Sequence, residues 1–126
     1  MNQIIHTNNA PAAIGPYSQA VKAGNLLFVS GQIPIDPATG AFAGEDITTQ
    51  TRQSLTNVQA ILEEASYTLA DVVKATVLLA DMADFAAMNA VYAQFFTTNC
   101  PARAAFAVKE LPRGAKVEIE VIACRG

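Results

Sequence analysis

An arginine and a glutamate near the end of the chain have side chains suited to binding and acid-base chemistry. Arg103 and Glu118 lie in the stretch Pro101 to Ile119, which reads PARAAFAVKELPRGAKVEI. Two apolar, strand-like runs are separated there by a short polar loop, and two strands joined by a turn would bring both charges into one neighbourhood. A guanidinium and a carboxylate framed by apolar residues are costly to bury unless each charge has a use.

Spacing alone leaves two interpretations of this pair open. In one, Arg103 and Glu118 form an ion pair inside the protein. In the other, the arginine binds the carboxylate of a small ligand through its planar fork of donors, and the glutamate lines the same cleft. Alternation along the second run places Glu118 and Glu120 on the face opposite its apolar residues, so one carboxylate can be structural while the other faces a ligand.

Other kinds of catalytic or metal chemistry are poorly supported. His6 is the only histidine, and neither Cys100 nor Cys124 has a partner at zinc spacing, so we expect no metal. A cysteine or serine nucleophile would need His6 as its base, and both cysteines are better interpreted as small apolar residues. The glycines form neither GxGxxG nor GxxxxGK, which argues against a phosphate loop.

Composition limits the class of protein. The 126 residues, 1–126, fit a single domain, and a net charge of −3 makes a nucleic-acid partner unexpected. No signal peptide and no apolar run of membrane-spanning length is visible, so we expect a cytoplasmic protein without a membrane partner. Charged residues make up 15% of the chain and apolar residues 52%. With so few charges to cover its surface, the chain is expected to form a homo-oligomer.

The elements expected to position these residues form an α+β fold. Strands are predicted at Gln3–His6, Ser18–Lys22, Leu26–Ser30, Ala41–Gly44, Asp71–Leu79, Ala104–Val108 and Val117–Ala123. Helical periodicity covers Ile47–Ser66, after an Asp46 cap, and Phe85–Phe96, after a cap at Asp81 or Asp84.

Two details of these elements bear on the core. The first helix is predicted to leave Gln50 and Asn57 on its polar face, and Val73 is predicted to share a face with Ala75.

The order of elements implies a crossover connection, and hence a mixed sheet with both helices on one face. The other face would then be an apolar oligomer interface.

Four motifs resemble those of the reactive intermediate deaminases, also called the translation-inhibitor or perchloric-acid-soluble protein family. They are PARAAFAVKELPRGAKVEIE, IGPYSQAV at Ile14–Val21, LLFVSGQIP at Leu26–Pro34 and MNAVYAQFF at Met88–Phe96. The resemblance implies a chorismate-mutase-like fold, a mixed six-stranded sheet with two helices on one face. It also implies a homotrimer whose sheets form a central barrel, with clefts between subunits.

The activity implied by the resemblance is hydrolysis of 2-imino acids, or their enamine tautomers, to 2-keto acids and ammonia without a cofactor. Such species, including 2-iminobutanoate and 2-iminopropanoate, are released by pyridoxal-phosphate enzymes. Arg103 would clamp the substrate carboxylate, and Glu118 would position or activate the attacking water. Tyr17 would line the cleft beside them as a third catalytic residue.

Further substrate-binding residues follow from the same resemblance. Ser30 would line the cleft, Gly31 would offer its backbone carbonyl to the substrate nitrogen, and Asn89 would contribute from the second helix. Ala105 stands where many members carry a cysteine. If the family contact there is the backbone amide, alanine preserves it, but any property that depends on the thiol is absent.

A protein of another class remains as an alternative. It is a non-catalytic trimeric module that binds a keto acid or docks a protein partner without turnover. Ribonuclease activity and translation inhibition are also associated with the family. The acidic charge balance and the single histidine argue against those activities here.

Overall fold

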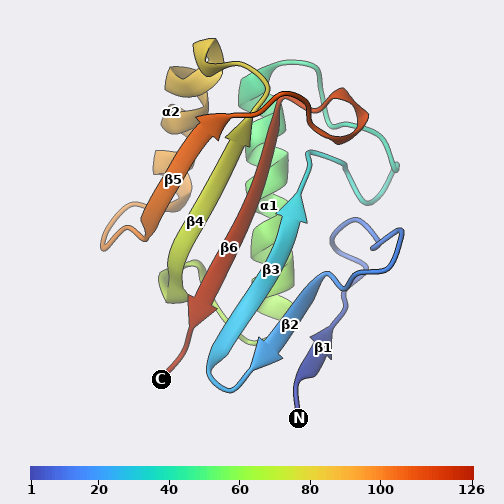
Figure 1. The fold of residues 1–126 in the computed structure, drawn as a ribbon, viewed down its shortest axis with the longest axis vertical. Helices are drawn as coiled ribbons and strands as arrows, with labels where there is room; N and C mark the ends of the chain where they lie inside the picture. Colours follow the sequence, from blue (N-terminus) through green and yellow to red (C-terminus); the bar gives the residue numbers. More distant parts are fainter.

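The computed structural model describes residues 1–126 as a six-stranded sheet with two α-helices (Figure 1). The elements are β1 (Gln3–Ile5), β2 (Ala20–Ala23), β3 (Leu26–Gln32), α1 (Ile47–Glu64), β4 (Val72–Leu79), α2 (Phe85–Phe95), β5 (Ala102–Ala107) and β6 (Val117–Cys124). The strand order is β1-β2-β3-β6-β4-β5, and only β4 and β5 pair in parallel. The predicted mixed sheet and α+β class are confirmed.

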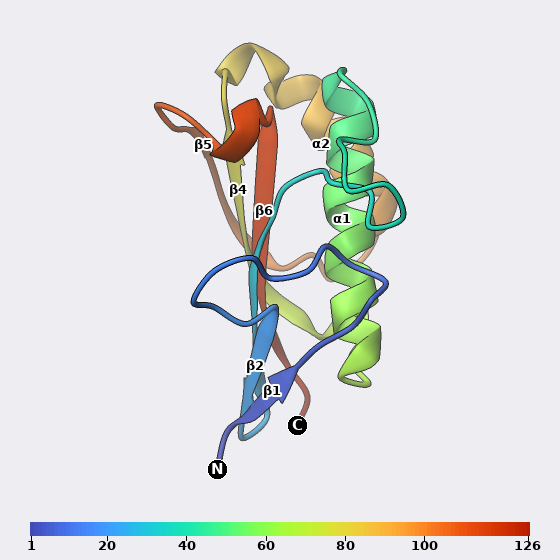
Figure 2. The same cartoon turned by 90° about the vertical axis from the view of Figure 1, so that its right-hand side faces the viewer.

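Both helices pack on the same side of the sheet, as predicted (Figure 2). The residues of β6 alternate, so that Val117 and Ile119 are buried under the helices while Glu118 and Glu120 face the other way. The opposite sheet face has no helical cover. Large apolar side chains remain exposed on that face, among them Phe28 and Phe106, at 43% and 47%. No helix is long and apolar enough to cross a membrane.

Local signals account for the ends of the helices. Asp46 accepts a hydrogen bond from the backbone N–H of Thr49 at 3.0 Å, which confirms the predicted cap of α1. The helix ends at Glu64, and Ser66, predicted to be helical, adopts a positive φ of 64°. Of the two candidate caps for the second helix, Asp84 occupies the N-cap position of α2 but makes no side-chain capping bond. Asp81 instead caps the 3-10 turn Met82–Asp84, where its side chain accepts a hydrogen bond from the N–H of Ala83.

Two predictions about α1 were wrong, because Gln50 and Asn57 are buried rather than exposed. Gln50 donates to the carbonyl of Gly44 and accepts from the N–H of Lys116. Asn57 donates to the carbonyls at the ends of the segment 33–35. Amide side chains can be buried when they satisfy loop backbone groups in this way, and helical periodicity does not record such tertiary partners.

Two strand predictions were also wrong. The segment Ala41–Gly44 forms only an isolated bridge between Ile35 and Phe42, because the return after the Gly40 turn is too short for a ladder. At the start of β4 the pairing with β6 shifts register between Val72 and Lys74. This irregularity buries Val72 and leaves Val73 47% exposed, so the alternation predicted for the strand holds only from residue 75 onward.

Candidate functional site

Arg103 and Glu118 do not meet within one chain, which corrects the expected neighbourhood. Strand β4 lies between β5 and β6 in the sheet. Arg103 is in register with Ala75, which is fully buried on the helix side, whereas Glu118 is in register with Leu78 on the uncovered side. Paired residues of neighbouring strands point to the same face, so the two charges project from opposite faces. The interpretation as an ion pair inside one chain was therefore wrong.

Glu118 packs directly against the backbone of Gly31. A Cβ atom at residue 31 would overlap the Oε2 atom of Glu118 and would lie 2.9 Å from its Cδ. The β3–β6 pairing is also irregular between Val29 and Gln32, around this glycine. Glycine in a strand commonly marks a bulge or a close approach of another group, and both features coincide at Gly31.

Burial raises the pKa of the Glu118 carboxyl above its ordinary value of 4.5, and the nearby charge of Glu120 raises it further. Arg103 is not close enough in the same chain to oppose these two effects. The neutral form of Glu118 therefore persists to higher pH than that of an exposed glutamate. Such a carboxyl is suited to taking up and returning a proton.

A hollow of about 510 Å³ lies beside this carboxyl and is named the Glu118 cleft. Its lining includes Ile14, Tyr17, Ser30, Gly31, Ile33 and Glu118. Tyr17 is half exposed, and the Ser30 hydroxyl donates to the carbonyl of Ser18 at 2.6 Å. Four of the predicted site residues, Tyr17, Ser30, Gly31 and Glu118, are therefore brought together.

Arg103 belongs to a second hollow, of about 460 Å³, at the edge of the sheet. Its Nη1 donates to the Oδ1 of Asn89 at 2.7 Å, and its guanidinium lies 4.7 Å from the ring centroid of Tyr92 and 5.6 Å from that of Phe85. We name this space, together with the residues that line it, the Arg103 hollow. The guanidinium is exposed rather than buried, so its remaining donors are available to a ligand or another chain.

Ala105 lines neither of these two hollows. It is in register with Val77 and packs against the hydrophobic core. Tyr92, predicted only as part of the aromatic core, is 6% exposed and also stacks with Arg103. Ile14 was not predicted as a site residue, although it opens the motif that contains Tyr17.

Comparisons with known proteins place the chain in a family. Residues 7–125 match the family described as Endoribonuclease L-PSP. A RutC family protein of Pyrococcus horikoshii is 58% identical over 98% of both chains. A Salmonella typhimurium protein named 2-iminobutanoate/2-iminopropanoate deaminase is 52% identical over 99% of both. The crystal structure of Escherichia coli TdcF with bound serine superposes with a TM-score of 0.95 at 46% identity, covering 98% of this chain and 99% of TdcF. The chain therefore belongs to the RutC, or Endoribonuclease L-PSP, family.

Proposed function

We propose that this protein hydrolyses 2-imino acids, or their enamine tautomers, to 2-keto acids and ammonia, with 2-iminobutanoate and 2-iminopropanoate as representative substrates. Its family membership and the relative named as a deaminase support the reaction type. The observation that carries the proposal is the Glu118 carboxyl, which has a raised pKa and lines a cleft with Tyr17 and Gly31.

The reaction site would be completed by a second copy of the chain. Because Arg103 and Glu118 project from opposite faces of one sheet, a cleft that contains both needs each from a different copy. Arg103 lies on β5, an edge strand, where a neighbouring subunit can approach it. In a homotrimer built as a barrel of sheets, the uncovered faces with Phe28 and Phe106 would be buried toward the centre.

Arg103 of one copy would hold the substrate carboxylate through two charge-assisted hydrogen bonds. The carbon of the iminium group, C2, would then face a water molecule beside Glu118 of another copy. Because an iminium carbon is already electrophilic, fixing the reactants and moving one proton supply most of what the reaction needs. The Gly31 carbonyl can accept an N–H of the substrate, and Tyr17 lines the same space.

Proton transfer would pass through Glu118 in two steps. The ionised carboxylate first takes a proton from the water as its oxygen bonds to C2. The neutral carboxyl then returns this proton to the amino nitrogen, and ammonia leaves as the C2–N bond breaks. The hydroxyl group at C2 loses its proton to solvent to give the keto acid. A pKa raised toward neutrality helps both steps, because the group must lose and regain a proton readily.

The experiment that tests this function separates a catalyst from a binding module. The protein is added to a serine or threonine dehydratase, and loss of the imine is followed while binding of 2-ketobutyrate is measured on the same preparation. Faster loss of the imine together with binding is the expected result. Binding without any acceleration would instead support the non-catalytic keto-acid-binding module.

A further inference from the structure

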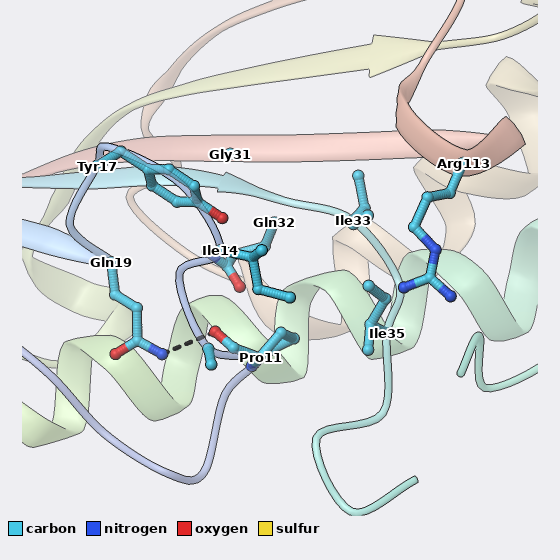
Figure 3. Close-up of a pocket in the computed structure, with 10 residues that line it drawn as sticks. Pro11, Ile14, Tyr17, Gln19, Gly31, Gln32, Ile33, Ile35 and Arg113 are labelled. Atoms are coloured by element: carbon cyan, nitrogen blue, oxygen red, sulfur yellow. Dashed lines mark hydrogen bonds between the residues drawn. The ribbon is translucent and has the colours of Figure 1, made fainter. Parts of the chain in front are cut away.

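An apolar hollow of about 250 Å³ adjoins the Glu118 cleft at the end of β3. The two spaces share four lining residues, Ile14, Tyr17, Gly31 and Ile33. Figure 3 shows the side chains of Ile14 and Tyr17 on one side of this hollow and those of Ile33 and Ile35 farther along it. A ligand held next to Glu118 can therefore extend directly into the apolar hollow.

One wall of the apolar hollow is a loop fixed by the buried amide of Gln19, which is 2% exposed. The Oε1 of Gln19 accepts from the N–H of Thr7 at 2.8 Å. Its Nε2 donates to the carbonyls of Thr7 at 3.0 Å and of Pro11 at 2.8 Å, and the latter bond is drawn in Figure 3. These bonds hold the loop open in advance, so a ligand need not order it.

The other wall is fixed by a second buried amide. Asn57 of α1 is fully buried, and its Nδ2 donates to the carbonyl of Ile33 at 3.3 Å and to that of Ile35 at 2.9 Å. The backbone that carries both isoleucines is thereby tied to the helix. The apolar hollow is thus bounded by two segments that separate buried amides hold in place, which makes it a preformed cavity.

The size of the apolar hollow indicates what it accepts. An apolar cavity of about 150 Å³ is large enough for benzene. A methyl or ethyl group, the side chain of 2-iminopropanoate or 2-iminobutanoate, would leave most of this larger space unfilled. We propose that the hollow is the side-chain subsite of the Glu118 cleft and that it selects 2-imino acids with a branched apolar side chain of about four carbons. This inference rests on the proposed function, because it names the substrate class of the same site.

Arg113 forms one end of the apolar hollow, away from Gln19 (Figure 3). Its guanidinium lies 5.6 Å from the ring centroid of Phe42, and the residue is exposed. The stacking holds the charge at the solvent-facing end, while Ile14, Ile33 and Ile35 line the space itself. An isobutyl group would fill the isoleucine-lined space, whereas an acidic side chain would have to cross that space to reach Arg113 at its far end.

Binding of the product 2-keto acids tests the subsite independently of turnover. Calorimetry would compare pyruvate, 2-ketobutyrate, 4-methyl-2-oxopentanoate and 2-ketoglutarate on the assembled protein. Each carbon removed from water strengthens binding about fourfold. The isobutyl group has three more carbons than the methyl group, so Kd is expected to fall roughly 60-fold from pyruvate to 4-methyl-2-oxopentanoate. Equal Kd values, or tightest binding of 2-ketoglutarate, would overturn the proposal.

Two variants that fill the apolar hollow test whether this hollow is the source of the tighter binding of 4-methyl-2-oxopentanoate. Ile35→Phe and, in the exposed part of the loop, Ala12→Phe should reduce the roughly 60-fold preference to roughly threefold, because the bulkier ring takes the place of the isobutyl group. Ile4→Phe is the matched control, since Ile4 is 62% exposed on β1 and outside the hollow. If Ile35→Phe and Ala12→Phe both keep the full preference, the side chain of the keto acid binds elsewhere and the proposal is wrong.

Turnover measured in parallel separates the two proposals. An amino-acid oxidase generates the imines of alanine and leucine, and their hydrolysis is followed with each protein. Side-chain-dependent binding without hydrolysis would refute the deaminase function and keep the subsite. Equal hydrolysis of both imines with equal Kd values would keep the deaminase and refute the subsite. If no keto acid binds and neither imine is hydrolysed faster, both proposals are overturned.

Discussion

The Glu118 cleft and the Arg103 hollow are built in different ways. The carboxyl of Glu118 is packed on Gly31, and burial within its own chain raises its pKa. Arg103 stays exposed on an edge strand, where Asn89 and Tyr92 orient its guanidinium. A single copy therefore prepares the acid-base group by itself. Its anion-binding group is oriented but remains in solvent until a ligand or another subunit covers it.

The largest expected effect comes from the Arg103 hollow. Replacing Arg103 with alanine removes two charge-assisted hydrogen bonds to the substrate, which should lower kcat/KM about a thousandfold. The fold should remain intact, because the guanidinium is exposed. The measurement is imine hydrolysis together with a thermal melt. Arg52→Ala is the matched control, since Arg52 is also exposed and donates to a side chain of α2, that of Gln94.

A somewhat smaller effect is expected in the Glu118 cleft. Glu118→Gln keeps the shape of the side chain but cannot take up a proton, so kcat should fall about a hundredfold. Binding of 2-ketobutyrate should change much less than kcat, because Arg103 provides the carboxylate clamp. Steady-state kinetics and calorimetry on the same preparation measure both quantities. A loss of binding with an unchanged kcat would make Glu118 a structural residue.

Mixing these two inactive variants tests whether the two regions meet between copies. In a randomly mixed oligomer, about a quarter of the clefts combine Arg103 from a Glu118→Gln chain with Glu118 from an Arg103→Ala chain. Co-refolded protein should therefore recover about a quarter of the wild-type activity. Each variant refolded alone is the control. Absence of any recovery in oligomers verified to be mixed would contradict a composite cleft.

Much of the fold could be predicted from local sequence patterns. The alternation of β6 and the Asp46 cap depend on residues close in sequence, and both were predicted correctly. The sheet face of Glu118 follows from that alternation. The contact of Glu118 with Gly31 was not predicted, because the register between β3 and β6 joins distant parts of the chain.

The position of Arg103 relative to Glu118 could not be predicted in this way. The two residues lie in consecutive strands, and a turn between such strands commonly makes them neighbours. Here β5 instead pairs in parallel with β4, which follows α1 and precedes α2 in the chain. Strand order is decided by the packing of the whole sheet. The buried amides of Gln50 and Asn57 were missed for the same reason, because their partners are loop groups far away in sequence.

The smallest expected effect is on stability, and it also probes the distance between the two regions. Because the folded-state pKa of Glu118 is raised, the native protein binds more protons than the unfolded chain at pH values above 4.5. Stability is therefore lost as pH rises through the raised pKa. Glu118→Gln removes this loss and should stabilise the protein at neutral pH, but not below 4.5. The gain should stay under about 1 kcal/mol, since the half-exposed carboxyl is screened by solvent.

In the proposed assembly, Arg103 of a neighbouring copy would lower the pKa of Glu118 and so reduce that gain. The stabilisation by Glu118→Gln at neutral pH should then be larger in an Arg103→Ala background than in the wild type. Urea unfolding at one fixed protein concentration measures both differences, with the exposed Glu110→Gln as the control. An equal gain in both backgrounds would mean that Arg103 of another copy does not approach Glu118. The cleft would then have to be completed by some other cation.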